Sequence, residues 1–229
     1  MTENVERELK LVPADAGLLD RLAGMDRLGP FVVRGRRREL QRNCFFDTSS
    51  RALGREGIGF RRRTVEGQKL ATWTLKGDGE LTRGIASRSE IELQLDPDTP
   101  PALALGALRD AARSRGAPAV AEAVDDARAT GGLPLAQPYL ETETDRAILD
   151  LEAPERGWSV ELALDRMRLI GHRYADIEIE AELKRGDDSA LEAVREAIGA
   201  LGEVRESDAS KLSRALRHIE HCHRDMRGS

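Results

Sequence analysis

The segment from Asp176 to Lys184 alternates charged and apolar residues at every step, and this pattern constrains the fold more than any other feature. Side chains two residues apart on a β-strand point the same way, so one strand face would be apolar and the other charged. Four carboxylates in a row are costly unless solvent or cations separate them. The apolar face would hold Ile177, Ile179, Ala181 and Leu183, and the charged face Asp176, Glu178, Glu180, Glu182 and Lys184.

A second segment near the N-terminus repeats part of this pattern. Glu6, Glu8 and Lys10 would share one face of a strand, and the same Glu-x-Glu-x-Lys spelling recurs at Glu180 to Lys184. A divalent cation held by two such carboxylates would remove their repulsion, and a cation beside an ammonium suits a polyphosphate. A solvated face of a one-sided sheet explains the motif equally well when it is taken alone.

Strand patterns dominate both ends of the chain, and helical patterns dominate its middle. Residues 31–33 and 40–47 are predicted as separate strands, and 102–128 as an Ala-rich helical region that breaks around Gly116 and Pro118. We expect one domain over residues 1–229, with a strand-rich half at 1–96, a helical insert at about 97–130, and a strand-rich half with C-terminal helices at 131–229. Further alternating segments are 59–64, 69–76, 88–95, 139–149 and 158–165.

Composition limits the compartment and the class of partner. The 229 residues are 40% hydrophobic, which suits a folded core, and they contain no apolar run long enough for a membrane span. The N-terminus lacks the basic and apolar regions of a signal peptide, and Cys44 and Cys222 are too few for a disulfide framework. We therefore expect a cytoplasmic protein without a membrane partner.

The net charge of −5 and an aromatic content of 3% argue against a nucleic-acid partner. Positive charge is nevertheless concentrated in one region, which is either a solvated surface or an anion site. Arg61 and Arg63 share a strand face there and form a comb suited to phosphate oxygens, although an exposed basic face is the simpler explanation. The region holds Arg34, Arg36, Arg37, Arg38, Arg42, Arg51, Arg55, Arg61, Arg62 and Arg63.

Taken in order, these motifs resemble the CYTH family, also called triphosphate tunnel metalloenzymes, over nearly the whole chain. The resemblance implies an α+β fold: an eight-stranded antiparallel β-barrel that forms a tunnel, with helices packed outside and charges of both signs inside. Sequence periodicity alone does not distinguish this tunnel from a sheet whose charged faces meet water. The motifs that carry the resemblance are Glu6-x-Glu8-x-Lys10, Gly59-Phe60-Arg61-Arg62-Arg63, Thr74-Leu75-Lys76, Arg88-x-Glu90-x-Glu92 and Ile177 to Leu183.

The resemblance also implies roles for individual residues. Glu6, Glu8, Glu178 and Glu180 look like metal ligands. Glu182 joins them if the acidic run aligns with the family motif two residues further along. Glu90 and Asp165 look like catalytic acids that handle the attacking water, and Lys10 is placed with them. Asp165 is followed by Arg166 and Met167 where the family usually has a glycine. Lys10, Arg61, Arg63, Lys76, Arg146 and Lys211 look like ligands of the triphosphate oxygens.

The implied enzyme is a metal-dependent triphosphatase that uses Mg²⁺ or Mn²⁺ on a small-molecule triphosphate. Inorganic triphosphate is the expected substrate, because few aromatic residues are present to hold a ring and Trp73 falls on the apolar face opposite Lys76. Cyclisation of ATP, as in class IV adenylate cyclases, is the second expectation. Thiamine triphosphate hydrolysis and a non-catalytic polyphosphate-binding module remain alternatives, and the sequence leaves the oligomeric state open.

Overall fold

The computed structural model describes residues 5–82, 85–207 and 209–227, and within these ranges it omits the side chains of residues 5, 78–82, 86–88 and 222–227. The chain divides into two compact units. The first unit consists of Met1–Glu8, Glu39–Thr82 and Ala86–Thr144, and the second of Leu9–Arg38, Arg83–Ile85 and Asp145–Ser229. Each unit is described by itself below.

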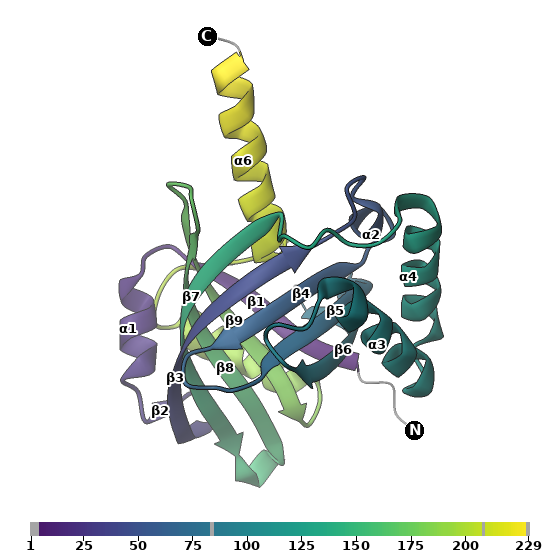
Figure 1. Cartoon of the computed structure of the whole chain (residues 1–229). Helices are drawn as coiled ribbons and strands as arrows, with labels where there is room; N and C mark the ends of the chain where they lie inside the picture. Colours follow the sequence, from purple (N-terminus) through teal and green to yellow (C-terminus); the bar gives the residue numbers. More distant parts are fainter. Residues whose placement is uncertain (1–4, 83–84, 208, 228–229) are drawn as a thin grey trace. The chain divides into compact units, whose positions relative to one another are not determined.

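Strands and three helices make up the first unit (Figure 1). Its strands β3, β4 and β5 pair in antiparallel order, with Asn43 opposite Arg63 and Gly59 opposite Lys76. Its elements are the start of β1 (Val5–Pro13), the end of β3 (Phe31–Phe46), α2 (Ala52–Arg55), β4 (Gly59–Val65), β5 (Ala71–Thr82), most of β6 (Ile85–Leu95), α3 (Pro101–Ser114), α4 (Pro118–Gly131) and the start of β7 (Leu140–Ala153).

The apolar faces of these strands form a core beneath α3 and α4. Trp73 is fully buried, with ring centroids of Phe46 and Phe60 each 5.5 Å away. Leu105 of α3 and Val124 of α4 belong to the same core. Both helices begin with proline, whose fixed φ suits the first helical turn. The predicted helical region with a break before Pro118 is therefore confirmed.

The second unit packs two helices on the apolar face of β8 and β9. Leu162, Leu164 and Ile179 are buried there with Leu19 of α1 and Val194 of α5. Its elements are the rest of β1, α1 (Gly17–Ala23), β2 (Arg27–Leu28), the start of β3, the end of β7, the 3₁₀ helix η1 (Pro154–Arg156), β8 (Trp158–Leu169), β9 (Ala175–Arg185), α5 (Asp188–Gly199), β10 (Val204–Glu206) and α6 (Lys211–Arg227).

Local chemistry fixes the connection from β9 into α5. Gly186 has φ +113°, and a Cβ at this position would lie 2.6 Å from Cδ1 of Trp158, so only glycine fits without strain. Asp187 then caps α5, because its Oδ1 accepts a hydrogen bond from the backbone N–H of Ser189 at 2.9 Å. The alternation predicted for β9 is kept up to this turn.

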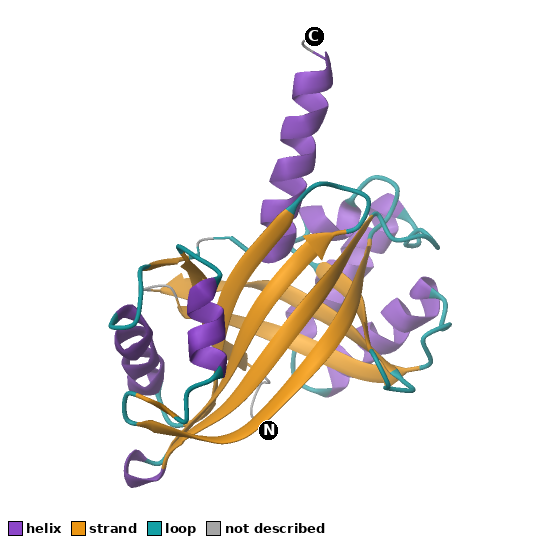
Figure 2. Ribbon diagram, turned by 90° about the vertical axis from the view of Figure 1, so that its left-hand side faces the viewer, coloured by secondary structure: helices purple, strands orange, loops and turns teal. Residues whose placement is uncertain are grey.

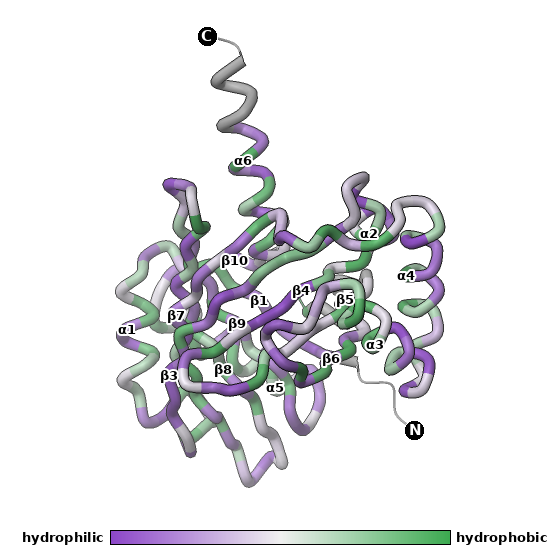
Figure 3. The backbone as a smooth tube through the Cα atoms, in the orientation of Figure 1, coloured by the Kyte–Doolittle hydropathy of each residue, from purple (hydrophilic) through white to green (hydrophobic). Residues whose placement is uncertain are grey.

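The strand order is β10-β1-β6-β5-β4-β3-β7-β8-β9, with β2 on β3 and a further pairing between β1 and β9. Figure 2 distinguishes these strands from the helices by colour, and Figure 3 colours the backbone by the hydropathy of each residue. The α+β class, with an antiparallel sheet and helices packed on it, is confirmed.

The prediction of separate strands at 31–33 and 40–47 is wrong, because β3 is continuous over Phe31–Phe46. The intervening segment lacks apolar alternation, but its charged side chains find partners on neighbouring strands of the second unit. These ion pairs provide partners for the charged side chains of the extended segment, which has no apolar face. They are Arg34 Nε to Glu152 Oε2 at 3.6 Å, Arg37 NH1 to Asp150 Oδ1 at 2.9 Å, and Arg38 Nε to Asp145 Oδ1 at 2.7 Å.

Candidate functional site

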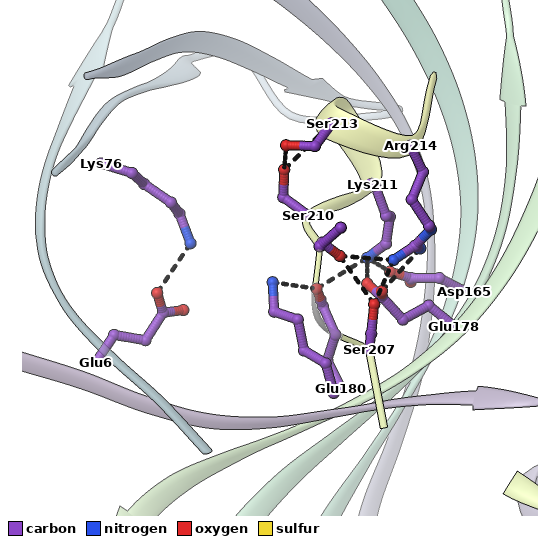
Figure 4. Close-up of polar contacts among 12 residues, drawn as sticks. Glu6, Lys76, Asp165, Glu178, Glu180, Ser207, Ser210, Lys211, Ser213 and Arg214 are labelled. Carbon is purple, nitrogen blue, oxygen red and sulfur yellow. Dashed lines mark hydrogen bonds and ion pairs between the residues drawn. The ribbon is translucent and has the colours of Figure 1, made fainter. Parts of the chain in front are cut away.

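A lysine in the first unit joins two of the predicted acids. Lys76 Nζ, on β5, lies 2.9 Å from Glu6 Oε2 and 3.1 Å from Glu90 Oε2, and Figure 4 shows the contact with Glu6. These residues come from three strands, β5, β1 and β6, so the sheet brings together charges that are far apart in sequence. Glu8 is two residues after Glu6 on β1, and its side chain is buried.

Arg61 is held by longer contacts than Lys76. Its NH2 group lies 3.4 Å from Thr74 Oγ1, 3.8 Å from Glu90 Oε1 and 3.9 Å from Glu92 Oε1. Its Nε is buried and makes no hydrogen bond within the part of the chain that is described. A guanidinium in this state has donor capacity left for an anion such as a phosphate.

The neighbours of Arg61 on β4 point in the directions that the sequence predicts. Arg63 shares the face of Arg61, and its Nε donates to Asn43 Oδ1 at 3.3 Å. Arg62 points to the other face, where its NH1 donates to the Pro97 carbonyl at 2.7 Å and its guanidinium lies 5.7 Å from the ring centroid of Trp73. Arg61 and Arg63 thus form the predicted pair, and Arg62 has a packing role. The Arg88 side chain lies outside the described residues.

Three carboxylates of the second unit converge on one ammonium. Lys211 Nζ, at the start of α6, lies 2.5 Å from Asp165 Oδ2, 2.8 Å from Glu178 Oε2 and 2.9 Å from Glu180 Oε1. Figure 4 shows the lysine pointing to these acids. The antiparallel register of β8 and β9 puts Asp165 opposite Glu178, which explains why their side chains meet.

Two further cations complete this network. Arg146 on β7 binds Asp165 through two hydrogen bonds, Nε to Oδ1 at 2.7 Å and NH2 to Oδ2 at 2.6 Å, and its NH2 lies 2.5 Å from Glu180 Oε2. Lys10 Nζ on β1 lies 3.3 Å from Glu180 Oε1. Glu180 therefore has three cationic partners. The sequence resemblance had assigned all of these residues to the site, and the structure brings them together.

Burial and charge move the pKa values of the acids in different directions. Burial raises the pKa of Asp165, but the charges of Arg146 and Lys211 outweigh it and hold this pKa below its ordinary value. Burial likewise acts on Glu180, yet Lys211, Lys10 and Arg146 hold its pKa well below the ordinary value. Burial dominates at Glu178 and raises its pKa, with the charge of Glu180 acting in the same direction. Neighbouring glutamates thus differ in proton affinity.

Lys211 shows the reverse balance. Burial lowers the pKa of its ammonium, but the charges of Asp165, Glu178 and Glu180 outweigh burial and raise the pKa above the ordinary value for lysine. Lys211 is therefore charged at neutral pH. The network is a set of ionised groups that compensate one another.

Arg214 is a member of this network that the sequence motifs missed. Its Nε donates to Asp176 Oδ2 at 2.6 Å, and its NH2 lies 2.8 Å from Glu178 Oε1. It follows Lys211 by three residues on α6, a spacing that places both side chains on one helix face. That spacing is a signal in the sequence, but it becomes informative only once Lys211 is known to point to Glu178.

The surroundings of Glu182 and Asp165 differ from those that the family resemblance implies. Glu182 Oε1 pairs with Lys184 Nζ at 2.7 Å, further along β9 from Glu178 and Glu180. Asp165 lies inside β8, which continues to Leu169, so no turn follows it where the family usually has a glycine. Its side chain is fully buried and still points to Arg146 and Lys211.

The second unit supplies carboxylate oxygens, the donor type that divalent cations such as Mg²⁺ bind, but it holds them in ion pairs. In the parts of the chain that the structure describes, no three His, Cys, Asp or Glu side chains are spaced as ligands of one metal ion. The carboxylates converge on the Lys211 ammonium instead. Both oxygens of the fully buried Glu178 lie close to cations, yet neither makes an aligned hydrogen bond with a described residue. Carboxylate oxygens with unused lone pairs are the ligands that Mg²⁺ and Mn²⁺ prefer.

Comparison with known proteins identifies the type of domain. A family model described as the CYTH domain matches residues 4–216. None of the curated proteins compared with the chain matches it. Across the described residues, no helix combines the length and apolar character needed to cross a membrane.

Solved structures share the fold at low sequence identity. HpAC1 from Hippeastrum, a proposed adenylyl cyclase reported with a dominant triphosphatase activity, is 24% identical, with a TM-score of 0.61 over 91% of this chain and 93% of that one. A proposed adenylate cyclase from Bacillus halodurans is 21% identical, with a TM-score of 0.54 over 92% and 97%. The PH1819 protein from Pyrococcus horikoshii is 16% identical, with a TM-score of 0.52 over 93% and 99%.

Proposed function

The chain belongs to the CYTH domain family, and from this premise we propose that it is a metal-dependent triphosphatase. Its proposed reaction is the hydrolysis of inorganic triphosphate to pyrophosphate and phosphate with Mg²⁺ or Mn²⁺. The observation that carries the proposal is the buried second-unit network, in which three carboxylates meet the ammonium of Lys211 within 2.9 Å. The triphosphatase activity reported for HpAC1, a structure of the same fold, agrees with this proposal.

The charge of the network explains how it would exchange its own ion pairs for those of a substrate. Four acids are balanced by four cations among Asp165, Asp176, Glu178, Glu180, Lys10, Arg146, Lys211 and Arg214. A divalent cation on Glu178 and Glu180 would make the sum positive and release Lys211 from them. The network would then favour a polyanion such as triphosphate.

Each group has a proposed task in hydrolysis. Glu178 and Glu180 would hold the divalent ion, which supplies positive charge to the phosphate oxygens when it is bound. Lys10, Arg146 and Lys211 would bind and orient those oxygens. Asp165, kept ionised by its low pKa, would orient the attacking water through a hydrogen bond. Stabilising the charge that develops on the phosphate would account for most of the rate enhancement.

The first unit carries most of the remaining residues to which the family resemblance gives a role. Arg61, Arg63 and Lys76 remain predicted ligands of phosphate oxygens, and Arg61 has the least committed donors of the three. Glu6 and Glu8 remain predicted metal ligands, with Glu182 of the second unit as an alternative. Glu90 remains a predicted catalytic acid that positions water, and it already contacts Lys76.

The aromatic side chains support a substrate made of phosphate alone. Trp73 is buried between phenylalanines, and the ring of Trp158 lies 6.1 Å from that of Phe31. Tyr139 lies under the guanidinium of Arg51 at 3.3 Å, and Tyr174 stacks on His218. These rings already have packing partners, so they offer little to a nucleobase or a thiazole ring.

One aromatic residue favours a second candidate function, the conversion of ATP to cyclic AMP. Phe45 is partly exposed and lies directly opposite Arg61 across the β3–β4 pair, so both side chains share a face. A base could stack on this ring while the guanidinium binds phosphate. The Phe45→Ala variant should leave tripolyphosphate hydrolysis unchanged and reduce only a reaction of ATP.

The test measures phosphate, pyrophosphate and cyclic AMP released from tripolyphosphate, ATP and thiamine triphosphate in parallel. Each substrate is supplied with Mg²⁺, with Mn²⁺ or with a chelator. Metal-dependent release from tripolyphosphate supports the proposal, whereas pyrophosphate with cyclic AMP from ATP identifies a cyclase. Release from thiamine triphosphate alone would identify that compound as the substrate. No release from any of them, together with tight binding of tripolyphosphate, would favour a binding module.

A further inference from the structure

Arg214 makes a different kind of contact from Lys211, its neighbour on the same face of α6. All three nitrogens of its guanidinium are close to protein oxygens. Nε donates to Asp176 Oδ2 at 2.6 Å, and NH1 donates to Ser207 Oγ at 2.6 Å and to the Ala209 carbonyl at 2.7 Å. The third nitrogen, NH2, lies 2.8 Å from Glu178 Oε1. Figure 4 shows this side chain beside Glu178.

These contacts tie the start of α6 to one face of β9. Asp176 and Glu178 are two residues apart on this strand, so their carboxylates point the same way. Arg214 bridges them, and Tyr174 supports Asp176 through a hydrogen bond from its hydroxyl at 3.3 Å. A planar guanidinium with fixed donor directions holds such a bridge more rigidly than an ammonium does.

Arg214 and Lys211 contact different oxygens of Glu178. Its Oε1 faces Arg214 and its Oε2 faces Lys211, both at 2.8 Å. Lys211 has two other acidic partners and a single ammonium that can move between them. Arg214 is fixed by Asp176 and by the loop before α6, so its position relative to Glu178 is set independently of Lys211.

The contacts of Nε and NH1 would hold the start of α6 in place without the third nitrogen. The hydrogen bonds of Nε and NH1 already join α6 to β9 and to the preceding loop. The NH2 group is buried, and its ion pair with Glu178 at 2.8 Å is a further link from α6 to β9. Its close neighbour is Glu178 Oε1, and its charge therefore acts on the orientation of that carboxylate.

We infer that Arg214 is a positioning residue for Glu178, which it holds in the orientation that binds a divalent cation. The inference rests on the proposed function, since it assigns Glu178 to a metal site. Lys211 is the exchangeable cation, which leaves Glu178 when metal and substrate bind. Arg214 is the fixed cation, which keeps the carboxylate plane in place during that exchange.

The test measures Mn²⁺ binding to the full chain by isothermal titration calorimetry, without substrate. Loss of a residue that orients a metal ligand typically weakens metal binding about 10–100-fold, and this loss is expected for Arg214→Gln. Arg214→Lys should recover part of the affinity, because an ammonium can reach Glu178 or Asp176 but does not bridge both. Arg217→Gln is the matched control, since Arg217 is exposed on the same helix and its Nε donates to the Ser213 carbonyl at 3.4 Å.

The outcomes separate this inference from the proposed function. Unchanged Mn²⁺ affinity in a folded Arg214→Gln variant, with a wild-type chain that binds Mn²⁺, overturns the positioning role alone. A wild-type chain that binds no Mn²⁺ overturns the metal-dependent function and the positioning role together. Circular dichroism checks the fold of each variant. If Arg214→Gln does not fold, Arg214→Lys decides, and wild-type affinity in that variant overturns the inference.

Discussion

Carboxylates hold Arg61 of the first unit less closely than Lys211 and Arg146 of the second unit, although Lys76 of the first unit lies 2.9 Å from Glu6 Oε2. In the second unit, Lys211 and Arg146 meet carboxylate oxygens at 2.5–2.9 Å. In the first unit, the NH2 of Arg61 is 3.4 Å from a hydroxyl and at least 3.8 Å from a carboxylate. Asp165 and Glu178 are fully buried, whereas the Glu92 side chain of the first unit is 45% exposed.

This difference separates two ways of building a site for a polyanion. Closely paired, buried charges are oriented before a ligand arrives, but each of them also supports the fold. Loosely held charges are cheaper to redirect to a ligand and contribute little to stability. We therefore expect substitutions in the second-unit network to affect stability and turnover together, and those in the first unit to affect turnover alone.

The largest effect on stability is expected from Glu180→Gln in the second unit. The neutral amide leaves Lys10, Arg146 and Lys211 without their shared carboxylate, so the free energy of unfolding should fall by about 3–5 kcal/mol. Turnover of tripolyphosphate should fall by about 100-fold. Urea unfolding and phosphate release measure these quantities, with Glu152→Gln, which removes the exposed pair with Arg34, as the control in the same unit. A Glu180→Gln variant as stable as the wild-type protein would contradict the expected contribution of the second-unit network to stability.

Glu6→Gln should abolish metal-dependent turnover and leave the fold intact. Glu6 has one ion pair among those described, with Lys76 at 2.9 Å, whereas Glu180 has three, so losing it should lower the free energy of unfolding less, by about 1 kcal/mol. The same urea and phosphate-release measurements apply. Unchanged activity would remove Glu6 from the metal site, and a stability loss as large as that of Glu180→Gln would show that the units do not differ.

Arg61→Lys should act mainly on substrate binding. An ammonium does not reproduce the paired donors of a guanidinium, so KM for tripolyphosphate should rise about tenfold with little change in the free energy of unfolding. The control is Arg42→Lys, because Arg42 is exposed and pairs with Glu141 at 2.7 Å. Steady-state kinetics measure the effect, and equal changes in both variants would argue against a specific role for Arg61.

The smallest effect concerns pH and sharpens the description of the second-unit network. Cations hold the pKa of Glu180 well below its ordinary value of about 4.3, so its stabilising contribution is complete above that pH and is lost as pH falls. Burial raises the pKa of Glu178, so its contribution is present below about pH 4.3 and is lost as pH rises through the folded pKa.

The two glutamates should therefore change the pH profile of stability in opposite ways. Unfolding free energies measured by urea titration across acidic and neutral pH would show this. Glu180→Gln should flatten the loss of stability on the acidic side, and Glu178→Gln should flatten the loss at higher pH. Identical profiles for both variants would mean that the acids are equivalent, contrary to their different surroundings.

Alternation predicted which side chains share a face, but not which faces meet. Ile179 and Leu164 were expected on apolar strand faces, and both are buried in the core of the second unit. The register that sets Asp165 opposite Glu178 depends on strand pairing, which the local pattern does not contain. The break expected between 33 and 40 was wrong because ion pairs, rather than apolar burial, keep that segment of β3 extended.

The candidate site was predicted best where a motif supplied both a residue type and a position. Lys10, Arg146, Asp165, Glu178, Glu180 and Lys211 were assigned through the family resemblance, and they form one network. Arg214 was missed because its role depends on the packing of α6 against β9, which is a tertiary property. The metal ligands, the substrate and the cytoplasmic location stay predictions.

Boundaries between the units fall inside four strands, after Glu8 in β1, before Glu39 in β3, after Ile85 in β6 and after Thr144 in β7. Dividing the gene at the unit boundaries would therefore not give two intact modules, because it would interrupt these strands. Recombination between relatives should instead be tolerated in the turn between α3 and α4, at Arg115 to Ala117, where no strand is broken. The shared strands thus predict that this domain is inherited and exchanged as a whole.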